Sequence, residues 1–360
     1  MGKNAERAAE TAEVVDQSVV DVASLASWMD ARELVTGSDI RDLRPLSGGT
    51  QNIMLRFERG DRSFVLRRGP RHLRERSNRV IRREMRLLAA IADTDVPHPK
   101  LIAPCPEESV LGAAFYLMEP VTGINVAVEL PEPQASDPAM RHGMGLSVVD
   151  AIAKLGAVDH LAVGLADFGR VEGFLDRQVD RWLGELASYQ QYPGYPGASI
   201  GDVSTVAEWL RRNQPARWTP GILHGDYHFA NVLFEPAGTA VAAIVDWEMC
   251  TVGDPLLDLG WLLATWPHAE GGVAGMNSAL GGHSGFPTEA EVIARYAQHS
   301  TRDLSGIQWY AVLACFKLGI VLEGTYARAC AGQAPERVGQ RLHAATLSLF
   351  EQASRRINAA

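Results

Sequence analysis

The hydrophobic pattern of the chain changes character near residue 123. Before it, apolar residues recur at helical spacing over 21–35 and again over about 74–93. Between these segments, residues 52–69 alternate apolar and polar side chains on both sides of a Gly-Asp pair, which predicts a β-hairpin. Two proline-punctuated apolar stretches, 96–106 and 113–123, indicate further strands. The first part of the chain is therefore predicted to form a small sheet with one long helix inserted.

The second part of the chain is predicted to be mainly helical. Segments 140–161, 174–190 and 202–214 have apolar residues at helical spacing. Short apolar strands return within 222–246, and helices are expected again from about residue 256 onwards.

The longest apolar stretch, residues 309–327, approaches the length of a membrane span, but Lys317 and Glu323 interrupt it. This composition favours a buried helix. The polar beginning of the chain lacks the apolar core of a secretory signal. The four cysteines include no C-x-x-C pair, so neither a disulfide framework nor a zinc site is indicated. We therefore expect a cytoplasmic protein without membrane contact.

Charge is unevenly distributed over the 360 residues, whose net charge is −9. Residues 41–100 contain 15 Lys and Arg against 7 Asp and Glu, and the rest of the chain contains 19 against 36. The asymmetry indicates either two lobes with different roles or a solvated surface without functional meaning. Because the whole chain is acidic, nucleic acid is not an expected partner.

The sequence HGDYHFAN, residues 224–231, concentrates side chains that bind metals or move protons. One interpretation uses the histidines as ligands of a transition metal. The other uses Asp226 as a proton acceptor and Asn231 as a magnesium ligand. Phosphoryl transfer needs such groups, because it depends on positioning, on charge neutralisation and on hard oxygen ligands for Mg²⁺. Asp246, at the end of the next predicted strand pair, would complete such a metal site.

The metal-oxygenase interpretation needs His224, Asp226 and a distal histidine as iron ligands. The downstream candidates are His268, His283, His299 and His343. Their surroundings are predicted to be helical, so the β-rich fold of such an enzyme is not indicated. A zinc hydrolase that uses His224 and His228 lacks the helical H-E-x-x-H spacing. His228 is otherwise either a loop residue or a contact to the substrate.

The sequence motifs LHGDYHFANVLF, IVDWE and GDPLLDLG resemble those of the aminoglycoside phosphotransferase and choline kinase family. Together with residues 163–182, they are most similar to a subgroup related to the N-terminal kinase-like part of some acyl-CoA dehydrogenases. The resemblance extends over about residues 40–350. It implies an α+β, protein-kinase-like two-lobe fold, with a β-rich nucleotide-binding lobe over 21–121 and a mainly helical catalytic lobe over 122–360. The polar residues 1–20 are expected to form a flexible tail.

The resemblance also assigns roles to the residues around the opening motif. Asp226 matches the catalytic base, and Asn231 and Asp246 match the Mg²⁺ ligands. Asp258 matches an aspartate that braces the catalytic loop through backbone hydrogen bonds. His224 matches a structural histidine of the same loop.

In the first lobe, the resemblance implies a glycine-rich turn, a cation on the third strand and a glutamate on the following helix. The turn would consist of Gly48, Gly49, Thr50 and Gln51, because glycine lets backbone N–H groups approach phosphate. Arg67 stands at the cation position, since no lysine occurs between Lys3 and Lys100. Arg68 should then point to the other face of the sheet.

Glu84 would orient Arg67, although a surface ion pair with Arg79, Arg82 or Arg83 is the alternative. The nucleotide base would meet the backbone from Glu119 to Val121 and pack near Met118, which could equally be a core residue.

These expectations together describe a kinase that transfers phosphate from ATP, or less favourably GTP, to a hydroxyl of a small molecule. The alternative is a pseudokinase that binds nucleotide without transfer, although Asp226, Asn231 and Asp246 are all present. The sequence leaves the acceptor open among an aminoglycoside, an amine, a sugar and a hydroxyacyl compound. It also leaves open the oligomeric state and any role in antibiotic resistance.

Overall fold

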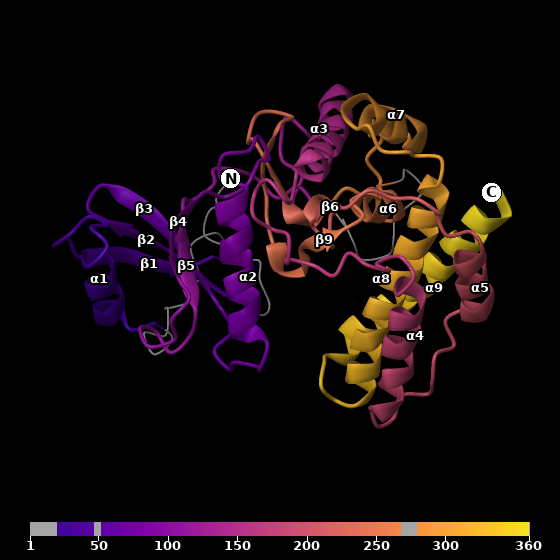
Figure 1. The fold of residues 1–360 in the computed structure, drawn as a ribbon, viewed down its shortest axis with the longest axis horizontal. Coiled ribbons are helices and arrows are strands. Elements are labelled where there is room, and N and C mark those ends of the chain that lie inside the picture. Colours follow the sequence, from indigo (N-terminus) through magenta and orange to yellow (C-terminus); the bar gives the residue numbers. More distant parts are fainter. Residues whose placement is uncertain (1–19, 47–51, 268–278, 360) are drawn as a thin grey trace, which may run out of the picture. The chain divides into compact units, whose positions relative to one another are not determined.

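The computed structural model describes residues 20–46, 52–267 and 279–359, and its contacts divide the chain into two compact units (Figure 1). Unit 1 comprises residues 1–93 and 98–121, and unit 2 comprises 94–97 and 122–360. The glycine-rich turn predicted at Gly48, Gly49, Thr50 and Gln51 lies outside the described residues, as do residues 1–19 of the predicted tail.

Unit 1 is built on a five-stranded antiparallel sheet with the strand order β1-β2-β3-β5-β4. Its elements in chain order are α1 (Val22–Asp30), β1 (Ile40–Pro45), β2 (Ile53–Arg59), β3 (Arg62–Arg68), α2 (Ser77–Ala90), β4 (Leu101–Cys105) and β5 (Phe115–Met118). The predicted hairpin is confirmed, because β2 and β3 pair in continuous register from Ile53 with Arg68 to Arg59 with Arg62. Both helices are shorter than their apolar patterns suggested.

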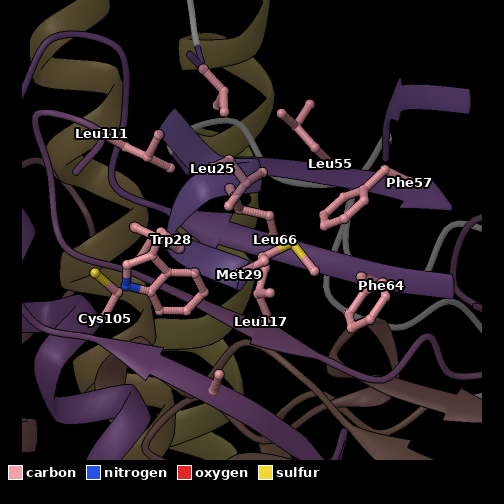
Figure 2. Close-up of a cluster of buried hydrophobic side chains, with 13 residues drawn as sticks. Leu25, Trp28, Met29, Leu55, Phe57, Phe64, Leu66, Cys105, Leu111 and Leu117 are labelled. Carbon is pink, nitrogen blue, oxygen red and sulfur yellow. The ribbon is translucent and has the colours of Figure 1, made fainter. Parts of the chain in front are cut away.

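The two faces of this sheet bury different chemistry. Figure 2 shows the apolar face, where Trp28 and Met29 of α1 pack with strand residues such as Phe57, Leu66 and Leu117. Side chains alternate along a strand, so Arg67 points to the face opposite Leu66, where it meets Glu84 of α2. The alternation seen in the sequence therefore produces one apolar layer and one face with a buried ion pair.

Unit 2 consists of helices and two short strand pairs. Strand β6 pairs with β9, and β7 pairs with β8. Its strands are β6 (Gly221–Leu223), β7 (Val232–Phe234), β8 (Val241–Ile244) and β9 (Thr251–Gly253). Its α-helices are α3 (Pro138–Ala157), α4 (Gln178–Ser188), α5 (Val203–Arg212), α6 (Leu256–Ala264), α7 (Glu289–His299), α8 (Ile307–Cys330) and α9 (Glu336–Ala359). The described residues of unit 2 also form the 3₁₀ turns η1 (Tyr189–Gln191), η2 (Phe229–Asn231) and η3 (Trp247–Met249). The three residues of β9 have too little pattern to be recognised in the sequence.

Helix α8 is the central helix of unit 2 and packs against α4, α5, α6 and α9. By length and composition it could cross a membrane, but 78% of its most apolar window is buried inside the protein. Burial on this scale makes it a core helix, as predicted from the two charges that interrupt it.

We expect Leu66→Ala to lower the free energy of unfolding by about 2–5 kcal/mol, because Leu66 is fully buried and its loss leaves a cavity. Denaturant unfolding followed by circular dichroism measures the change. Leu73→Ala is the matched control in the same unit, since Leu73 is 39% exposed and should change stability by less than about 1 kcal/mol. Equal effects of the two substitutions would contradict the assigned core.

Candidate active site

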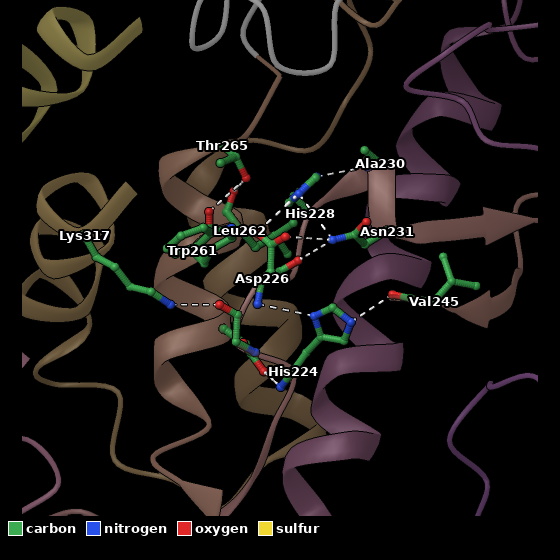
Figure 3. Close-up of polar contacts among 12 residues, drawn as sticks. His224, Asp226, His228, Ala230, Asn231, Val245, Trp261, Leu262, Thr265 and Lys317 are labelled. Carbon is green, nitrogen blue, oxygen red and sulfur yellow. Dashed lines mark hydrogen bonds and ion pairs between the residues drawn. The ribbon is translucent and has the colours of Figure 1, made fainter. Parts of the chain in front are cut away.

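The segment His224 to Asn231 forms a loop that connects β6 to β7 in unit 2 (Figure 3). Its last three residues form the turn η2, and His228 caps that turn by accepting a hydrogen bond from the N–H of Ala230. Most of the loop is buried, whereas the Asp226 side chain is 34% exposed. The loop therefore presents one accessible carboxylate on a rigid support.

Asp258, in the first turn of α6, holds the start of this loop. Its Oδ2 accepts the N–H of His224 at 2.5 Å, and its Oδ1 accepts the N–H of Gly225 at 2.8 Å. The side chain is 1% exposed, and burial raises the pKa of its carboxyl group. With both oxygens engaged by backbone donors, Asp258 fixes the direction in which the chain leaves β6.

The His224 ring is used as a structural connector. Its Nδ1 accepts the N–H of Asp226 at 3.3 Å, and its Nε2 donates to the carbonyl of Val245 at 2.9 Å. Because both ring nitrogens face backbone groups, neither is directed at a metal. Among the described residues, no group of three His, Cys, Asp or Glu side chains could hold a metal ion. The oxygenase interpretation is therefore not supported by this geometry, and its candidate His268 lies outside the described residues.

Val245 connects the loop to Asp246. Its N–H donates to the carbonyl of Asn231 at 2.9 Å, while its own carbonyl accepts the His224 ring. Asp246 follows directly and has φ 64° and ψ 63°, a left-handed backbone conformation that residues other than glycine rarely adopt. Such backbone conformations persist where the surroundings enforce them, often at functional sites. His224, Asn231 and Asp246 are thus connected through one residue.

The Asn231 amide is oriented by Asp226. Its Nδ2 donates to the Asp226 backbone oxygen at 2.9 Å and to Oδ2 of the Asp226 carboxylate at 3.1 Å. This leaves Oδ1 as the Asn231 group for a ligand. Together with the Asp246 carboxylate, it provides the hard oxygen donors that Mg²⁺ prefers. The residues present therefore fit a magnesium site.

The Asp226 carboxylate is held in its ionised form. Burial by itself would raise its pKa, but the hydrogen bond from His228 and the electrostatic influence of His228, His224 and the Lys317 ammonium outweigh burial. The net result is a pKa well below the usual range for an aspartate. His228 Nε2 lies 3.4 Å from Oδ1 of Asp226, so the histidine of unassigned role contacts the candidate base.

Gly225 meets a requirement for glycine in this loop. Its φ is 87°, and a Cβ at this position would lie 2.5 Å from the carbonyl oxygen of Met249. The Gly225 carbonyl accepts a hydrogen bond from Nζ of Lys317 at 2.8 Å. From the sequence, Lys317 was predicted only to interrupt an apolar helix, although a charge at such a position was the available signal.

In unit 1, Arg67 and Glu84 form a bidentate ion pair. Arg67 Nε lies 2.7 Å from Oε2, and Nη2 lies 3.0 Å from Oε1. Glu84 is 1% exposed and also accepts the hydroxyl of Tyr116 at 2.8 Å. The alternative of a surface ion pair within α2 is therefore wrong, because Glu84 is buried against the sheet. Tyr116 was not identified from the sequence.

The segment after β5 was predicted to meet the nucleotide base. Met118 is 6% exposed, as a core residue would be. The N–H of Glu119 already donates to the carbonyl of Lys100 at 2.9 Å. A base could therefore use the Glu119 carbonyl or the Val121 N–H, but not the Glu119 donor.

Comparison with known proteins identifies the family. A model of the phosphotransferase enzyme family matches residues 42–310, which is more than half of the chain. The protein belongs to this family, and the predicted membership is confirmed. The class of reaction that the family name describes is phosphoryl transfer.

Particular relatives refine the position within the family. Acyl-CoA dehydrogenase family member 11 of Rattus norvegicus is 30% identical over 327 residues, which cover 89% of this chain and 41% of the relative. Family member 10 of Mus musculus is 27% identical over 315 residues, which cover 87% of this chain and 29% of the relative. The chain thus spans less than half the length of these two relatives.

Solved structures confirm the protein-kinase-like α+β fold. A protein of Ralstonia eutropha described as an aminoglycoside phosphotransferase has a TM-score of 0.75 at 29% identity, covering 93% of this chain and 99% of that chain. A choline/ethanolamine kinase family protein of Mesorhizobium loti has a TM-score of 0.55 at 19% identity, covering 88% and 91%. The second likeness is one of fold alone.

We expect Asp258→Asn to destabilise the protein by about 1.5–3 kcal/mol, because the amide can accept only one of the two buried N–H groups. Thermal and denaturant unfolding measure the loss. Asp180→Asn is the control, because its ion pair with Arg211 is exposed and should contribute less than about 1 kcal/mol. Unchanged stability of the Asp258 variant would show that the loop does not depend on this brace.

Proposed function

We propose that this protein is a kinase that transfers the γ-phosphoryl group of ATP to a hydroxyl of a small molecule, with Asp226 as the catalytic base. The observation that supports this most strongly is the single accessible carboxylate on a buried, braced loop. Asp226 is ionised and its neighbours are fixed, which a positioned proton acceptor requires. GTP is the less favoured donor.

In the proposed reaction, the acceptor oxygen forms a bond to the γ-phosphorus and the bond from this phosphorus to the ADP oxygen breaks. The hydroxyl proton moves to the Asp226 carboxylate. The Asn231 amide keeps one oxygen of this carboxylate in place, and the low pKa of Asp226 suits late proton transfer in a loose transition state. The products are ADP and the phosphorylated acceptor.

Asn231 and Asp246 would hold Mg²⁺, which when bound neutralises phosphate charge. Arg67, oriented by Glu84, would bind the nucleotide phosphates through its guanidinium fork. Two neighbours of the same fold support a nucleotide and a small substrate. One, an aminoglycoside phosphotransferase variant, was solved with ADP and hygromycin B, and another, an aminoglycoside 2′-phosphotransferase, as a GDP complex.

For the acceptor, we propose a neutral or anionic hydroxyl compound, with a hydroxyacyl compound as the first candidate. Lys317 contacts the residue before Asp226. Its Nζ lies 5.5 Å from the ring centre of Trp182, and the Arg181 guanidinium carbon lies 5.1 Å from the same ring centre. These two cations would attract an anionic group of the acceptor. The names of the acyl-CoA dehydrogenase relatives support an acyl compound. The test is ATP consumption with Mg²⁺ over hydroxyacyl compounds, sugars, choline-like amines and aminoglycosides.

We expect Asp226→Asn to lower kcat by about 10²- to 10⁴-fold, because the amide cannot take up the acceptor proton. Steady-state kinetics with the acceptor found in that screen measure the loss, and nucleotide binding should survive. Asp93→Asn, which removes an exposed carboxylate, should retain full turnover. Full turnover by the Asp226 variant would remove the assigned base. Tight nucleotide binding without turnover of any acceptor would favour the pseudokinase instead.

We expect Asp246→Asn to weaken nucleotide binding in the presence of Mg²⁺ by at least about tenfold, because a hard cation loses an anionic ligand. Isothermal titration calorimetry with ATP, with and without Mg²⁺, separates this effect from loss of the nucleotide site. Binding of metal-free ATP should be unchanged or stronger, because one negative charge has been removed. Equal weakening under both conditions would contradict a metal-binding role.

A further inference from the structure

Lys317 is an unusual residue both in the sequence and in its surroundings. The chain contains 34 basic residues, of which only Lys3, Lys100, Lys154 and Lys317 are lysines. One of these few lysines lies within the core helix α8, between the buried residues Phe316 and Leu318. A chain that otherwise uses arginine has a compact ammonium group here.

The Lys317 side chain is half-buried, and its ammonium group lies near α4, α6 and the loop that carries Asp226. Nζ lies 4.3 Å from the ring centre of Trp261 on α6 and 5.5 Å from that of Trp182 on α4. Both rings are buried, at 4% and 6% exposure, and their faces attract a cation. Figure 3 shows the Lys317 side chain reaching from α8 to the loop that carries Asp226.

The hydrogen bond of Lys317 falls on the peptide unit directly before Asp226. The carbonyl of this unit, from Gly225, accepts Lys317 Nζ at 2.8 Å. Its N–H, from Asp226, donates to Nδ1 of His224 at 3.3 Å. The unit is therefore held at both ends. The residue before Asp226 is Gly225, and glycine has the widest backbone freedom. The direction of this peptide therefore depends on its hydrogen-bond partners.

We propose that Lys317 is a positioning residue, whose ammonium group holds the Gly225–Asp226 peptide so that the Asp226 carboxylate is presented to the acceptor hydroxyl. This inference rests on the proposed function of Asp226. An apolar side chain could fill the space in α8 without the desolvation that a cation requires. The ammonium provides a charge-assisted hydrogen bond to the loop, and its charge favours the ionised form of Asp226.

The position also makes the hydrogen bond dependent on pH. Burial lowers the pKa of Lys317 from its ordinary 10.5 to about 8, although Asp226 and Asp258 oppose this shift, and Arg181 adds to it. The charged ammonium is therefore present below about pH 8 and lost above it. In the unfolded chain it persists to about pH 10.5. Between these values the unfolded chain binds more protons, so this group makes the folded state more stable as pH rises.

The first experiment uses the full wild-type chain with isotope labels on all residues, of which only four lysines give side-chain ammonium signals. The Lys317 signal should titrate near pH 8, whereas exposed lysines titrate near about 10.4. The amide signals of Gly225 and Asp226 should shift with the same midpoint. This readout needs no acceptor, so it is separate from the proposed function. Loop amides that do not follow the Lys317 titration, at whatever pH it occurs, would overturn the inference.

The second experiment compares Lys317→Met with Lys154→Met, which removes an exposed lysine. Lys317→Met should lower kcat by about 10- to 100-fold, with little change in KM for ATP. The wild type should lose activity above about pH 8, and this alkaline decline should be absent in Lys317→Met but retained in Lys154→Met. A decline that persists in Lys317→Met would overturn the inference.

If Lys317→Met does not fold, the wild type still decides the question. Its alkaline decline in kcat should coincide with the lysine titration measured in the same buffer, and midpoints that differ would overturn the inference. If no acceptor is phosphorylated while the loop amides follow Lys317, the proposed function fails and the positioning contact stands.

Discussion

The candidate active site depends on how the chain leaves β6. Asp258 accepts the N–H groups of His224 and Gly225, and Lys317 binds the Gly225 carbonyl. The backbone polar groups of this short turn are thus satisfied by two charged side chains of opposite sign from α6 and α8. Because buried polar groups are expensive to leave unpaired, the turn has one favourable conformation. That conformation sets the position of Asp226.

A second chain of contacts links this turn to the strands that follow. The His224 ring and the Asn231 carbonyl both bind the backbone of Val245, so the conformation of the first loop is coupled to the residue before Asp246. Because Val245 is fixed by these contacts, the surroundings hold the backbone of Asp246 in its left-handed conformation. The proposed proton acceptor, Asp226, and the two proposed oxygen ligands, Asn231 and Asp246, are thereby organised mainly by backbone hydrogen bonds. The protein uses few side chains to position its chemistry.

Sequence reasoning predicted the elements that have strong periodicity. Repeated hydrophobic patterns predicted the hairpin of β2 and β3, helix α2 and the buried helix α8. It did not predict β9, whose three residues carry no period, or the ends of the helices, which tertiary contacts decide. The pairing of Arg67 with Glu84 was one of two readings. The hydrogen bond from Tyr116 to Glu84 was not predicted, because a tyrosine in a strand has the same sequence pattern as any core residue.

The sequence by itself determined which chemical groups the loop contains and at what spacing, and therefore the family and the class of reaction. It could not determine that the Asn231 amide binds Asp226, that His228 contacts the same carboxylate, or that Lys317 reaches the loop from 92 residues away. The first two contacts depend on the detailed fold of one loop, and the third joins two segments that are distant in the sequence. Packing of α6 and α8 against the loop brings Asp258 and Lys317 to its backbone, and the sequence pattern of neither helix names that partner.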